Sequence, residues 1–537
     1  MSYRRGERTV LVALLGLALL LGCFPMRDFD VWWHLRTARL IVESHAVPKV
    51  DVLTYTNAGR PWIDLYWFFQ LVLGGLYKLG GASALVLMKA IGGVLVVYLA
   101  WLSRRRGGRH WPLLLVWLPA LIVVSGRLCE RPELFSLIYL AGYFAVLANA
   151  SEKPRILWFL PLVQVLWVNS HGFFVLGPLV WAAYFADWLV DGLRPREVPV
   201  PRPPLKVAAL AGGASLLACV VNPYGLHVVD LPLQQFHKLG DSGLYRLNVG
   251  ELKNIGDFIA QSGFNNPYLL GLFLLLGLGI ASFVLSARKS RPSLFRALLF
   301  IAGAYLGWQA TRNSALFALI AATVTLWNLD DAFPSPASLR SATSPSFAGR
   351  GVPGAKALRS RSKKAPKKAD SDSPAGALFA VSAVALWILS GSLYAWAGEG
   401  RTIGLGERPH WYAHGACRFL AQPGMPTHVV AFNLGQAGVC EYHSAPPQTQ
   451  FMDPRLEVNT AETFERYLDS IRKLWRDQPG WELPLGIDYA KPNEVPAILI
   501  EHGVFERAVT ALAKDSRWQQ VYSDDVASAF VVKPPAP

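Results

Sequence analysis

The sequence predicts an all-α polytopic membrane protein with about 11 transmembrane helices and a small C-terminal α/β extracytoplasmic domain. Three observations predict this class. Hydrophobic residues make up 52% of the 537 residues, charged residues only 17%, and the mean hydropathy is +0.29. Long apolar runs recur between residues 9 and 396. The formal charge of +15 is concentrated beside these runs, which is typical of cytoplasmic membrane loops rather than of a nucleic-acid-binding protein.

Each apolar run is interpreted as a helix, because about 20 apolar residues cross the hydrocarbon core, or somewhat fewer when a helix is tilted or buried in protein. The expected spans are residues 9–25, 82–102, 111–127, 134–150, 155–169, 173–190, 205–221, 267–286, 294–310, 315–329 and 376–396. Arginines precede the first run as in a signal peptide, but no cleavage site of small residues follows it. We therefore expect an uncleaved first span.

Basic loops orient these spans. Clusters of arginine and lysine follow the second, fourth, sixth and eighth spans, around Arg104, Lys153, Arg194 and Arg288. The positive-inside rule places these loops and the N-terminus in the cytoplasm, provided that residues 62–79 do not cross the membrane. That stretch is rich in aromatic residues, and we interpret it as an interfacial helix on the outer surface. Residues 26–80 then form an outer region of juxtamembrane helices.

The last third of the chain changes in character. Residues 332–375 combine proline, serine and glycine with many basic residues, which predicts a disordered cytoplasmic linker. The expected domains are therefore a transmembrane domain at 1–331, this linker, a last transmembrane helix at 376–396 and an extracytoplasmic domain at 397–537. Strand-like runs at 428–432, 497–500 and 527–532 and helical patterns at 461–475 and 505–513 make the last domain α/β. The sequence leaves open whether Cys417 and Cys440 pair in it.

Polar residues gather in the first outer loop, directly after the first span. Asp28 and Asp30 flank one residue and are followed by His34 and Arg36. If a helix begins near Asp30, His34 lies one turn further on the same face. Carboxylates act as general bases or hold a divalent metal, and arginine binds phosphate through paired hydrogen bonds. The alternative is structural, with an aspartate capping a helix beside an ordinary belt of interfacial aromatic residues.

Three further polar clusters lie at span ends on the same predicted side. The first comprises Arg127, Glu130, Arg131 and Glu133, for which ion pairs at the interface are the structural alternative. His171 lies in a polar hairpin between two short apolar runs, where the alternative is a turn histidine. Arg312 interrupts an apolar stretch, and its charge is costly there unless it is paired or solvated. Together the clusters suit a cavity for a lipid with a phosphate head.

These residues resemble the GT-C superfamily of membrane glycosyltransferases. In that family an acidic pair follows the first span, as Asp28 and Asp30 do here, and juxtamembrane helices follow, as at 31–44 and 62–79. A group of bacterial GT-C-like proteins is more similar still and has six motifs in the same order. They are Asp-x-Trp-Trp-His-Leu-Arg at 30–36, Arg-Pro at 131–132, Asn-x-His-Gly at 169–172, Asn-Pro-Tyr-Gly at 222–225, Arg-Asn at 312–313 and Asp-x-Arg at 453–455. One departure is Tyr66, which stands where the group often has an acid that Asp64 or Glu133 would have to replace.

The resemblance implies an inverting glycosyltransferase that moves a sugar from a polyprenyl-phosphate-linked donor to an acceptor on the outer face of the membrane. Asp30, or Asp28, would be the catalytic base. The residues implied in binding substrate or its phosphate are His34, Arg36, Arg131, Glu133, His171 and Arg312. The expected partners are a polyprenyl-phosphate lipid, a glycan, lipid or protein acceptor, and membrane lipid, with no nucleic acid.

The expected location is the plasma (inner) membrane of the cell envelope, with a cytoplasmic N-terminus and a periplasmic C-terminal domain. No cofactor is certain from these motifs, and a divalent metal is left open.

Two alternatives stay open. The first is a non-catalytic GT-C-like membrane protein that binds a lipid-linked glycan or an envelope-assembly partner, because one fold hosts many functions. The second is a transporter or flippase, which is weakened by the lack of a nucleotide-binding motif and of an apparent internal repeat. Lys89 is the plainest charge inside a span, and we expect it to snorkel or to pair with Arg312 or Glu133.

Overall fold

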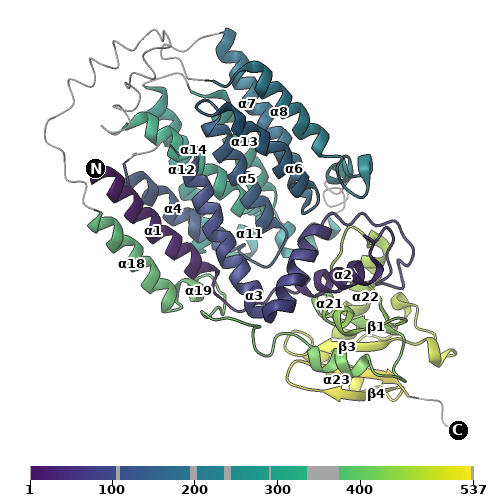
Figure 1. Ribbon diagram of the computed structural model, residues 1–537. Coiled ribbons are helices and arrows are strands. Elements are labelled where there is room, and N and C mark those ends of the chain that lie inside the picture. The colour runs from purple at the N-terminus through teal and green to yellow at the C-terminus, as the bar shows by residue number, and fades with distance from the viewer. Residues whose placement is uncertain are drawn as a thin grey trace, which may run out of the picture. The chain divides into compact units, whose positions relative to one another are not determined.

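The computed structural model describes residues 2–104, 109–193, 202–234, 243–288, 292–334 and 374–533. Helices dominate, and a small sheet forms near the C-terminus (Figure 1). The chain divides into two compact units. Unit 1 comprises Met1–Phe24 and Val86–Leu405, and unit 2 comprises Pro25–Leu85 and Gly406–Pro537. The predicted linker lies outside the described residues except at its two ends.

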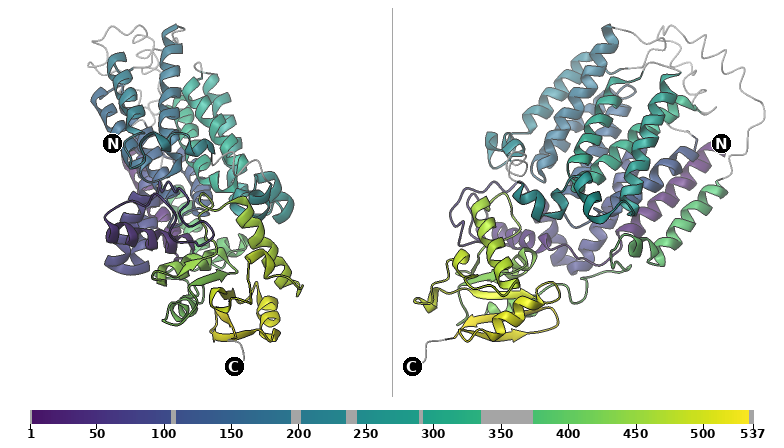
Figure 2. Two further views of the ribbon diagram at one scale, coloured as in Figure 1. Left: turned by 90° about the vertical axis from the view of Figure 1, so that its right-hand side faces the viewer. Right: turned by 180° about the vertical axis from the view of Figure 1, so that it is seen from behind.

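Unit 1 is a bundle of helices. They are α1 (Ser2–Gly22), the later part of α3 (Trp67–Leu102), α4 (Trp111–Ser125), α5 (Glu133–Asn149), η1 (Pro154–Trp158), α6 (Phe159–Val168), η2 (Gly172–Val175), α7 (Leu176–Leu193), α8 (Leu205–Ala218), η3 (Gly225–Val228), α10 (Leu244–Asn248), η4 (Gly250–Leu252), α11 (Ile255–Ser262), α12 (Pro267–Ala287), α13 (Leu294–Gln309), η5 (Thr311–Asn313), α14 (Ser314–Ala332), α18 (Ala375–Leu389) and α19 (Ser392–Trp396). Among them α14 is almost entirely buried, because it packs against α4, α12 and α13. Figure 2 shows the helices of this bundle from two further directions.

Four helical segments among the described residues are long and apolar enough to cross a membrane. They are Trp67–Leu102, Gly172–Leu193, Pro267–Ala287 and Thr311–Ala332. The expectation of eleven clear spans is therefore corrected to four, although each predicted range contains a helix. The shorter apolar helices have 10–17 residues. At a rise of about 1.5 Å per residue they fall short of a hydrocarbon core about 30 Å thick, a limit that an apolar run in the sequence does not reveal.

Helix α3 joins the predicted interfacial segment to the predicted second span. Its helical geometry is broken at Gly80 (φ −153°, ψ 20°) and Gly81 (φ 59°, ψ −152°). The positive φ of Gly81 lies in a region that glycine enters without a steric penalty. The break coincides with the boundary expected between residues 79 and 82, and the interfacial location of 62–79 stays a prediction.

A buried ion pair holds the start of this bundle. The Lys89 side chain is fully buried, and its Nζ lies 2.7 Å from Glu130 Oε1. It also donates to the Phe24 carbonyl oxygen at 2.8 Å and stands over the Phe24 ring. The expectation that Lys89 snorkels or pairs with Arg312 or Glu133 is therefore wrong. The partner is Glu130, and the pairing avoids the several kcal/mol that an uncompensated buried charge costs.

Unit 2 contains a five-stranded mixed sheet with the strand order β2-β1-β3-β5-β4. The strands are β1 (His428–Ala431), β2 (Thr449–Gln450), β3 (Ala497–Glu501), β4 (Trp518–Ser523) and β5 (Ala527–Val532). Strand β1 is parallel to β2 and β3, whereas β5 is antiparallel to β3 and β4. The three predicted strands are present. The sequence missed β2, which has two residues, and β4, whose polar edge-strand sequence has little alternation.

Helices cover this sheet. They are α20 (His414–Leu420), α21 (Leu434–His443) and α23 (Glu506–Lys514), with α22 (Ala461–Trp475) packed against α23 and short turns η6 (Leu483–Leu485) and η7 (Pro492–Glu494). A disulfide between Cys417 and Cys440 joins α20 to α21. The C-terminal region is thus α/β, as predicted, and its two cysteines pair.

The first outer loop belongs to the same compact unit as the sheet. Helix α2 (Asp30–Ser44) packs against α21. Residues 53–55 run alongside β2, because the Tyr55 amide donates to the Gln450 carbonyl oxygen at 2.9 Å and the Gln450 amide donates to that of Leu53 at 3.0 Å. Unit 2 therefore combines residues 25–85 with the chain from Gly406 onward. An independent domain at 397–537 stays a prediction.

A buried ionic network fastens this loop to the rest of unit 2. Arg455 donates from Nη2 to Asp51 Oδ1 at 2.6 Å and from Nε to Asp453 Oδ2 at 2.7 Å, and all three side chains are fully buried. The Arg455 guanidinium also stacks 4.4 Å from the centre of the Trp62 ring. Burial, and then the nearby Asp453 carboxylate, raise the pKa of Glu441 well above its usual value. Removing one member of such a network leaves a buried charge without compensation.

Candidate functional site

The predicted site residues fall into two groups. Asp28, Asp30, His34 and Arg36 lie in unit 2, whereas Arg131, Glu133, His171 and Arg312 lie in unit 1.

The acidic pair marks the start of α2. The helix begins at Asp30, as expected, and the Asp30 amide donates to Asp28 Oδ1 at 3.0 Å. Asp28 is buried, and its carbonyl oxygen accepts a hydrogen bond from the Tyr412 hydroxyl at 3.1 Å. The Asp28 side chain therefore binds the amide of the first helical residue, whereas the N-cap position is Phe29, which makes no side-chain capping bond. Asp30 is half-buried in the first turn, and this makes it the more accessible carboxylate of the pair.

His34 lies one turn beyond Asp30 on α2 and is buried. Its Nδ1 is 3.3 Å from Gln70 Nε2, which also donates to Asp64 Oδ1 at 3.0 Å. A carboxyl, an amide and an imidazole are thereby linked inside unit 2. Arg36 is also buried, which lowers the pKa of its guanidinium, and the Glu43 and Glu441 carboxylates oppose this. Phosphate binding by His34 and Arg36 stays a prediction.

Asp64 is a fully buried titratable carboxyl two residues before Tyr66. Its Oδ1 accepts the Tyr66 amide at 3.1 Å. Burial raises the pKa of Asp64 to about 7, and the hydrogen bonds from Tyr66 and Gln70 oppose this only in part. Asp64 thus occupies the segment in which the GT-C-like group often has an acid, with a pKa near neutrality.

The second group centres on a carboxylate that the sequence did not single out. Glu251, in η4, lies with Oε2 at 2.6 Å from Arg131 Nη1 and at 3.2 Å from Arg127 Nη1. Arg127 Nη2 is also 3.4 Å from Glu133 Oε1. Burial opposes the charge of Glu251, but Arg131, Arg127 and Arg312 outweigh it and hold the pKa of this carboxyl below its usual value. The interfacial ion pairs that formed the structural alternative are therefore present, with Glu251 as an added member.

His171 and Arg312 interact electrostatically with this group, because Glu133 and Arg312 act on the His171 imidazole and Arg312 acts on the Glu251 carboxylate. His171 Nδ1 accepts the Phe173 amide at 3.4 Å and lies 2.9 Å from Ser136 Oγ, so the histidine caps the turn at η2. Arg312 lies in η5, next to Thr311. The turn role expected as an alternative for His171 is present, and its role in substrate binding stays a prediction.

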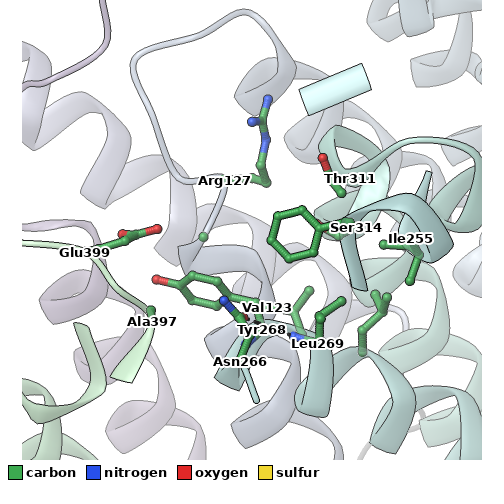
Figure 3. Close-up of a pocket in the computed structure, with 13 residues that line it drawn as sticks. Val123, Arg127, Ile255, Asn266, Tyr268, Leu269, Thr311, Ser314, Ala397 and Glu399 are labelled. Atoms are coloured by element: carbon green, nitrogen blue, oxygen red, sulfur yellow. Dashed lines mark hydrogen bonds between the residues drawn. The ribbon is translucent and has the colours of Figure 1, made fainter. Parts of the chain in front are cut away.

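A cavity of about 220 Å³ opens beside the arginines of unit 1. Its lining residues are Val123, Gly126, Arg127, Ile255, Phe258, Asn266, Tyr268, Leu269, Leu272, Thr311, Ser314, Ala397 and Glu399. Figure 3 shows Arg127 and Thr311 on one side of it and Val123 and Leu269 on the other. The cavity therefore combines apolar walls with a cationic side chain, as sites for amphipathic ligands do.

The described residues contain no group of three or more histidine, cysteine, aspartate or glutamate side chains arranged to hold a metal ion. Of the acidic pair, Asp28 already accepts the Asp30 amide. The divalent metal that the sequence left open stays a prediction.

Sequence reasoning missed Glu251 and gave Arg127 no role of its own. Glu251 is one of several acidic residues between the seventh and eighth predicted spans, and nothing in its local pattern sets it apart. It joins the site because Thr311 holds its segment: the Thr311 amide donates to the Lys253 carbonyl oxygen at 2.9 Å, and the Thr311 hydroxyl donates to that of Glu251 at 3.1 Å. Only the folded chain brings these segments together.

Comparison with known proteins gives matches among solved structures. The chain aligns with oligosaccharyltransferase AglB from Archaeoglobus fulgidus, in complex with an inhibitory peptide and a dolichol-phosphate, at 12% identity and a TM-score of 0.56, over 92% of this chain and 69% of AglB. A structure of the A. fulgidus oligosaccharyltransferase with Zn and sulfate aligns at 14% identity and a TM-score of 0.51, over 92% and 68%. ArnT from Cupriavidus metallidurans aligns at 15% identity and a TM-score of 0.50, over 98% of both chains.

No protein-family model matches the sequence, and no curated protein matches it. The chain shares the fold of AglB and ArnT over nearly its whole length. At 12% and 15% identity this likeness shows the fold, and membership of the GT-C superfamily, like that of the finer Asp-x-Trp-Trp-His-Leu-Arg group, stays a prediction.

Proposed function

We propose that the protein is a membrane glycosyltransferase that transfers a sugar from a polyprenyl-phosphate-linked donor to an acceptor on the outer face of the membrane. The observation that carries this proposal is the fold shared with AglB, a transferase whose structure holds a dolichol-phosphate, over 92% of this chain. The cationic cluster beside an apolar cavity in unit 1 suits the head and tail of such a lipid.

In the proposed reaction Asp30 takes the proton of the acceptor hydroxyl. The acceptor oxygen forms a bond to the anomeric carbon of the sugar while the bond from that carbon to the phosphate oxygen breaks. The lipid phosphate leaves with the electron pair, and the configuration at the anomeric carbon inverts. We assign binding of the phosphate to Arg131 and Arg312, with Glu133 and His171 beside them, because guanidinium groups stabilise the charge that develops on the leaving oxygen.

We further propose that the protein lies in the plasma membrane of the cell envelope, with a cytoplasmic N-terminus and an extracytoplasmic C-terminal domain. The Cys417–Cys440 disulfide supports this orientation, because such bonds persist in oxidising compartments and are rare in the cytosol. The acceptor would be a glycan, a lipid or a protein.

Asp30→Asn tests the mechanism. Asparagine keeps the size of the side chain but removes the proton acceptor, so transfer should fall by about 10²-fold or more while binding of polyprenyl phosphate is retained. Arg312→Ala should instead weaken binding, because it removes a cationic group from the cluster. Transfer and lipid binding are measured on the same purified variants.

The capping interpretation gives a different result. Asparagine is itself a good helix cap, so full activity of Asp30→Asn would exclude Asp30 as the base and leave Asp28→Asn as the next variant. Full activity of both variants would exclude this mechanism. Binding of the lipid without any transfer would favour a non-catalytic protein that binds lipid-linked glycans.

A further inference from the structure

Arg131, one of the two arginines assigned to phosphate, already binds an anion of the chain itself, together with Arg127. Arg131 and Arg127 both contact the same oxygen of Glu251, at 2.6 Å and 3.2 Å. One carboxylate oxygen shared by two guanidinium groups is the arrangement in which a phosphate oxygen is also held. Arg312 adds a third positive charge that acts on the same carboxylate.

The charges of this cluster suit an anion that carries more negative charge than a carboxylate. Three arginines, Arg127, Arg131 and Arg312, face two carboxylates, Glu133 and Glu251. If the Glu251 carboxylate turned away, the excess of positive charge would rise from one to two. The polyprenyl phosphate that leaves in the proposed reaction is a phosphate monoester, which carries nearly two negative charges at neutral pH and would restore the balance. The sugar-linked donor is a diester with a single negative charge.

The Glu251 side chain can leave without unfolding its segment. It is 28% exposed, so rotation about its side-chain bonds brings the carboxylate into solvent. The backbone around it is fixed independently, because Thr311 binds the carbonyl oxygens of Glu251 and Lys253. The carboxylate is therefore a separable part of an otherwise anchored turn.

The cavity supplies the complementary apolar surface. Arg127 and Thr311 line it together with Ile255, Leu269 and Leu272 (Figure 3). At about 220 Å³ it holds part of a ligand rather than a whole lipid. A phosphate at the arginines would thus have the first part of an apolar chain beside it.

We propose that Glu251 is an internal substitute for the ligand phosphate. A phosphate-headed polyprenyl lipid binds at Arg127 and Arg131, where its phosphate displaces the Glu251 carboxylate. The start of its chain then lies in the adjacent cavity. This rests on the proposed function for the identity of the lipid. It goes beyond that function because it identifies the Glu251 carboxylate as a competing anion, which neutralises the arginine cluster when no ligand is bound.

Glu251→Gln tests the displacement, because glutamine keeps the shape of the side chain but removes the charge that competes with phosphate. Binding of a long-chain polyprenyl phosphate to the purified full-length protein should tighten about tenfold, the scale of one lost charge-assisted hydrogen bond. Binding of the uncharged polyprenol of the same length should not change. Inorganic pyrophosphate, as an anion without a tail, should bind more weakly than the lipid and should also gain from Glu251→Gln.

Asp331→Asn is the matched control. Asp331 Oδ2 lies 2.7 Å from Arg296 Nη1 with side-chain exposures of 23% and 19%, close to those of the Glu251–Arg131 pair, but neither residue lines the cavity. Removing this carboxylate should leave binding of both lipids at the wild-type level. Equal or weaker binding of polyprenyl phosphate by Glu251→Gln, with Asp331→Asn unchanged, would overturn the proposal.

A second measurement uses the wild-type protein and does not depend on the folding of a variant. Carbodiimide modification of Glu251, quantified by mass spectrometry, should increase when polyprenyl phosphate is added and should not change with polyprenol. Unchanged or reduced modification would contradict displacement. Tighter binding by Glu251→Gln without any sugar transfer by the wild type would refute only the proposed function, whereas transfer without the gain in affinity would refute only the displacement.

Discussion

Asp64 gives unit 2 a titratable group near neutral pH. Its carboxyl is fully buried, and burial raises its pKa from 3.8 to about 7. The neutral form is therefore favoured in the folded state, and Gln70 links it to the buried His34. The charged groups that face it are Glu457, which adds to the rise, and Arg455, which opposes it.

The pKa of Asp64 predicts a specific loss of stability with pH. Below about pH 4 the carboxyl is protonated in both the folded and the unfolded chain. Between about pH 4 and pH 7 only the folded chain retains the proton. The stabilisation that this proton gives to the folded state therefore declines as the pH rises, by roughly 4 kcal/mol in total for a pKa shift of this size. Asp64→Asn cannot titrate and should flatten this part of the stability curve.

The measurement is thermal or denaturant unfolding of unit 2 in both proteins at several pH values. The difference between them isolates Asp64, because Glu441, whose pKa is also raised, is present in both. Parallel curves for wild type and Asp64→Asn would show that Asp64 does not bind a proton in this range.

Individual residues also show how far the sequence could lead. The positions of Asp28 just before a helix, of Asp30 at its start and of His34 one turn further on were predictable because they depend on neighbours in the sequence. The partners of Lys89 and of Arg131 were not, because Glu130 and Glu251 reach them only through tertiary packing. Local capping follows from short-range chemistry, whereas a long-range ion pair leaves no signal in a single sequence.

At the scale of elements, the contact between α2 and α21 depends on two glycines. An added Cβ at Gly435 would lie 2.3 Å from Phe29 Cγ, whereas at Gly438 the nearest atoms, of Phe29 and Trp33, are 3.6 Å away. Both glycines lie within α21. They therefore offer a matched pair of sites, one too tight for a methyl group and one with room for it.

Gly435→Ala should destabilise unit 2 by about 1–3 kcal/mol, the usual cost of overpacking. It should also lower transfer activity, because Phe29 immediately precedes Asp30. Gly438→Ala should be neutral or stabilising by up to about 1 kcal/mol, since alanine is the better helix former. Unfolding and transfer of the two variants are compared, and equal behaviour would show that α2 does not need close contact with α21.

Helix lengths explain why the elements were easier to find than to delimit. Hydropathy identified helices in all eleven predicted ranges, but within the part of the chain that the structure describes only four segments reach the length and composition of a clear span. In the range 155–169, for example, the first turn is a 3₁₀ helix that starts at Pro154, and only ten residues of α6 follow. A window of apolar residues reports burial in lipid or protein alike, and it does not report where the hydrogen-bonded helix ends.

At the scale of the whole molecule, the proposed orientation predicts a pattern of labelling. In a chain without the three cysteines outside the disulfide, Leu405→Cys should react with an impermeant thiol reagent added to intact cells. Arg105→Cys and Ala365→Cys should react only after the membrane is permeabilised. Labelling of position 365 in intact cells would contradict the proposed orientation and would allow residues 62–79 to be a span.

The fold class of the whole chain was predictable from the sequence, but its division into two compact units was not. The apolar runs and the C-terminal strand pattern are properties of separate stretches, and both appear in the structure. Unit 2 instead combines Pro25–Leu85 with Gly406–Pro537. The contacts that unite them, such as Asp51 with Arg455, join residues 404 positions apart, so no local pattern marks the boundary.

The split composition of unit 2 has a consequence for synthesis of the protein in the cell. About 320 residues separate its two segments, and ribosomes add roughly 5–20 residues per second, so the second segment follows the first by roughly 15–65 s. During that delay α2 lacks α21, and Trp32 and Trp33, which are buried in the finished unit, lack the part of their covering that the second segment supplies, such as Tyr442 and Val458. A product truncated before its last quarter would therefore leave one side of this aromatic helix permanently uncovered.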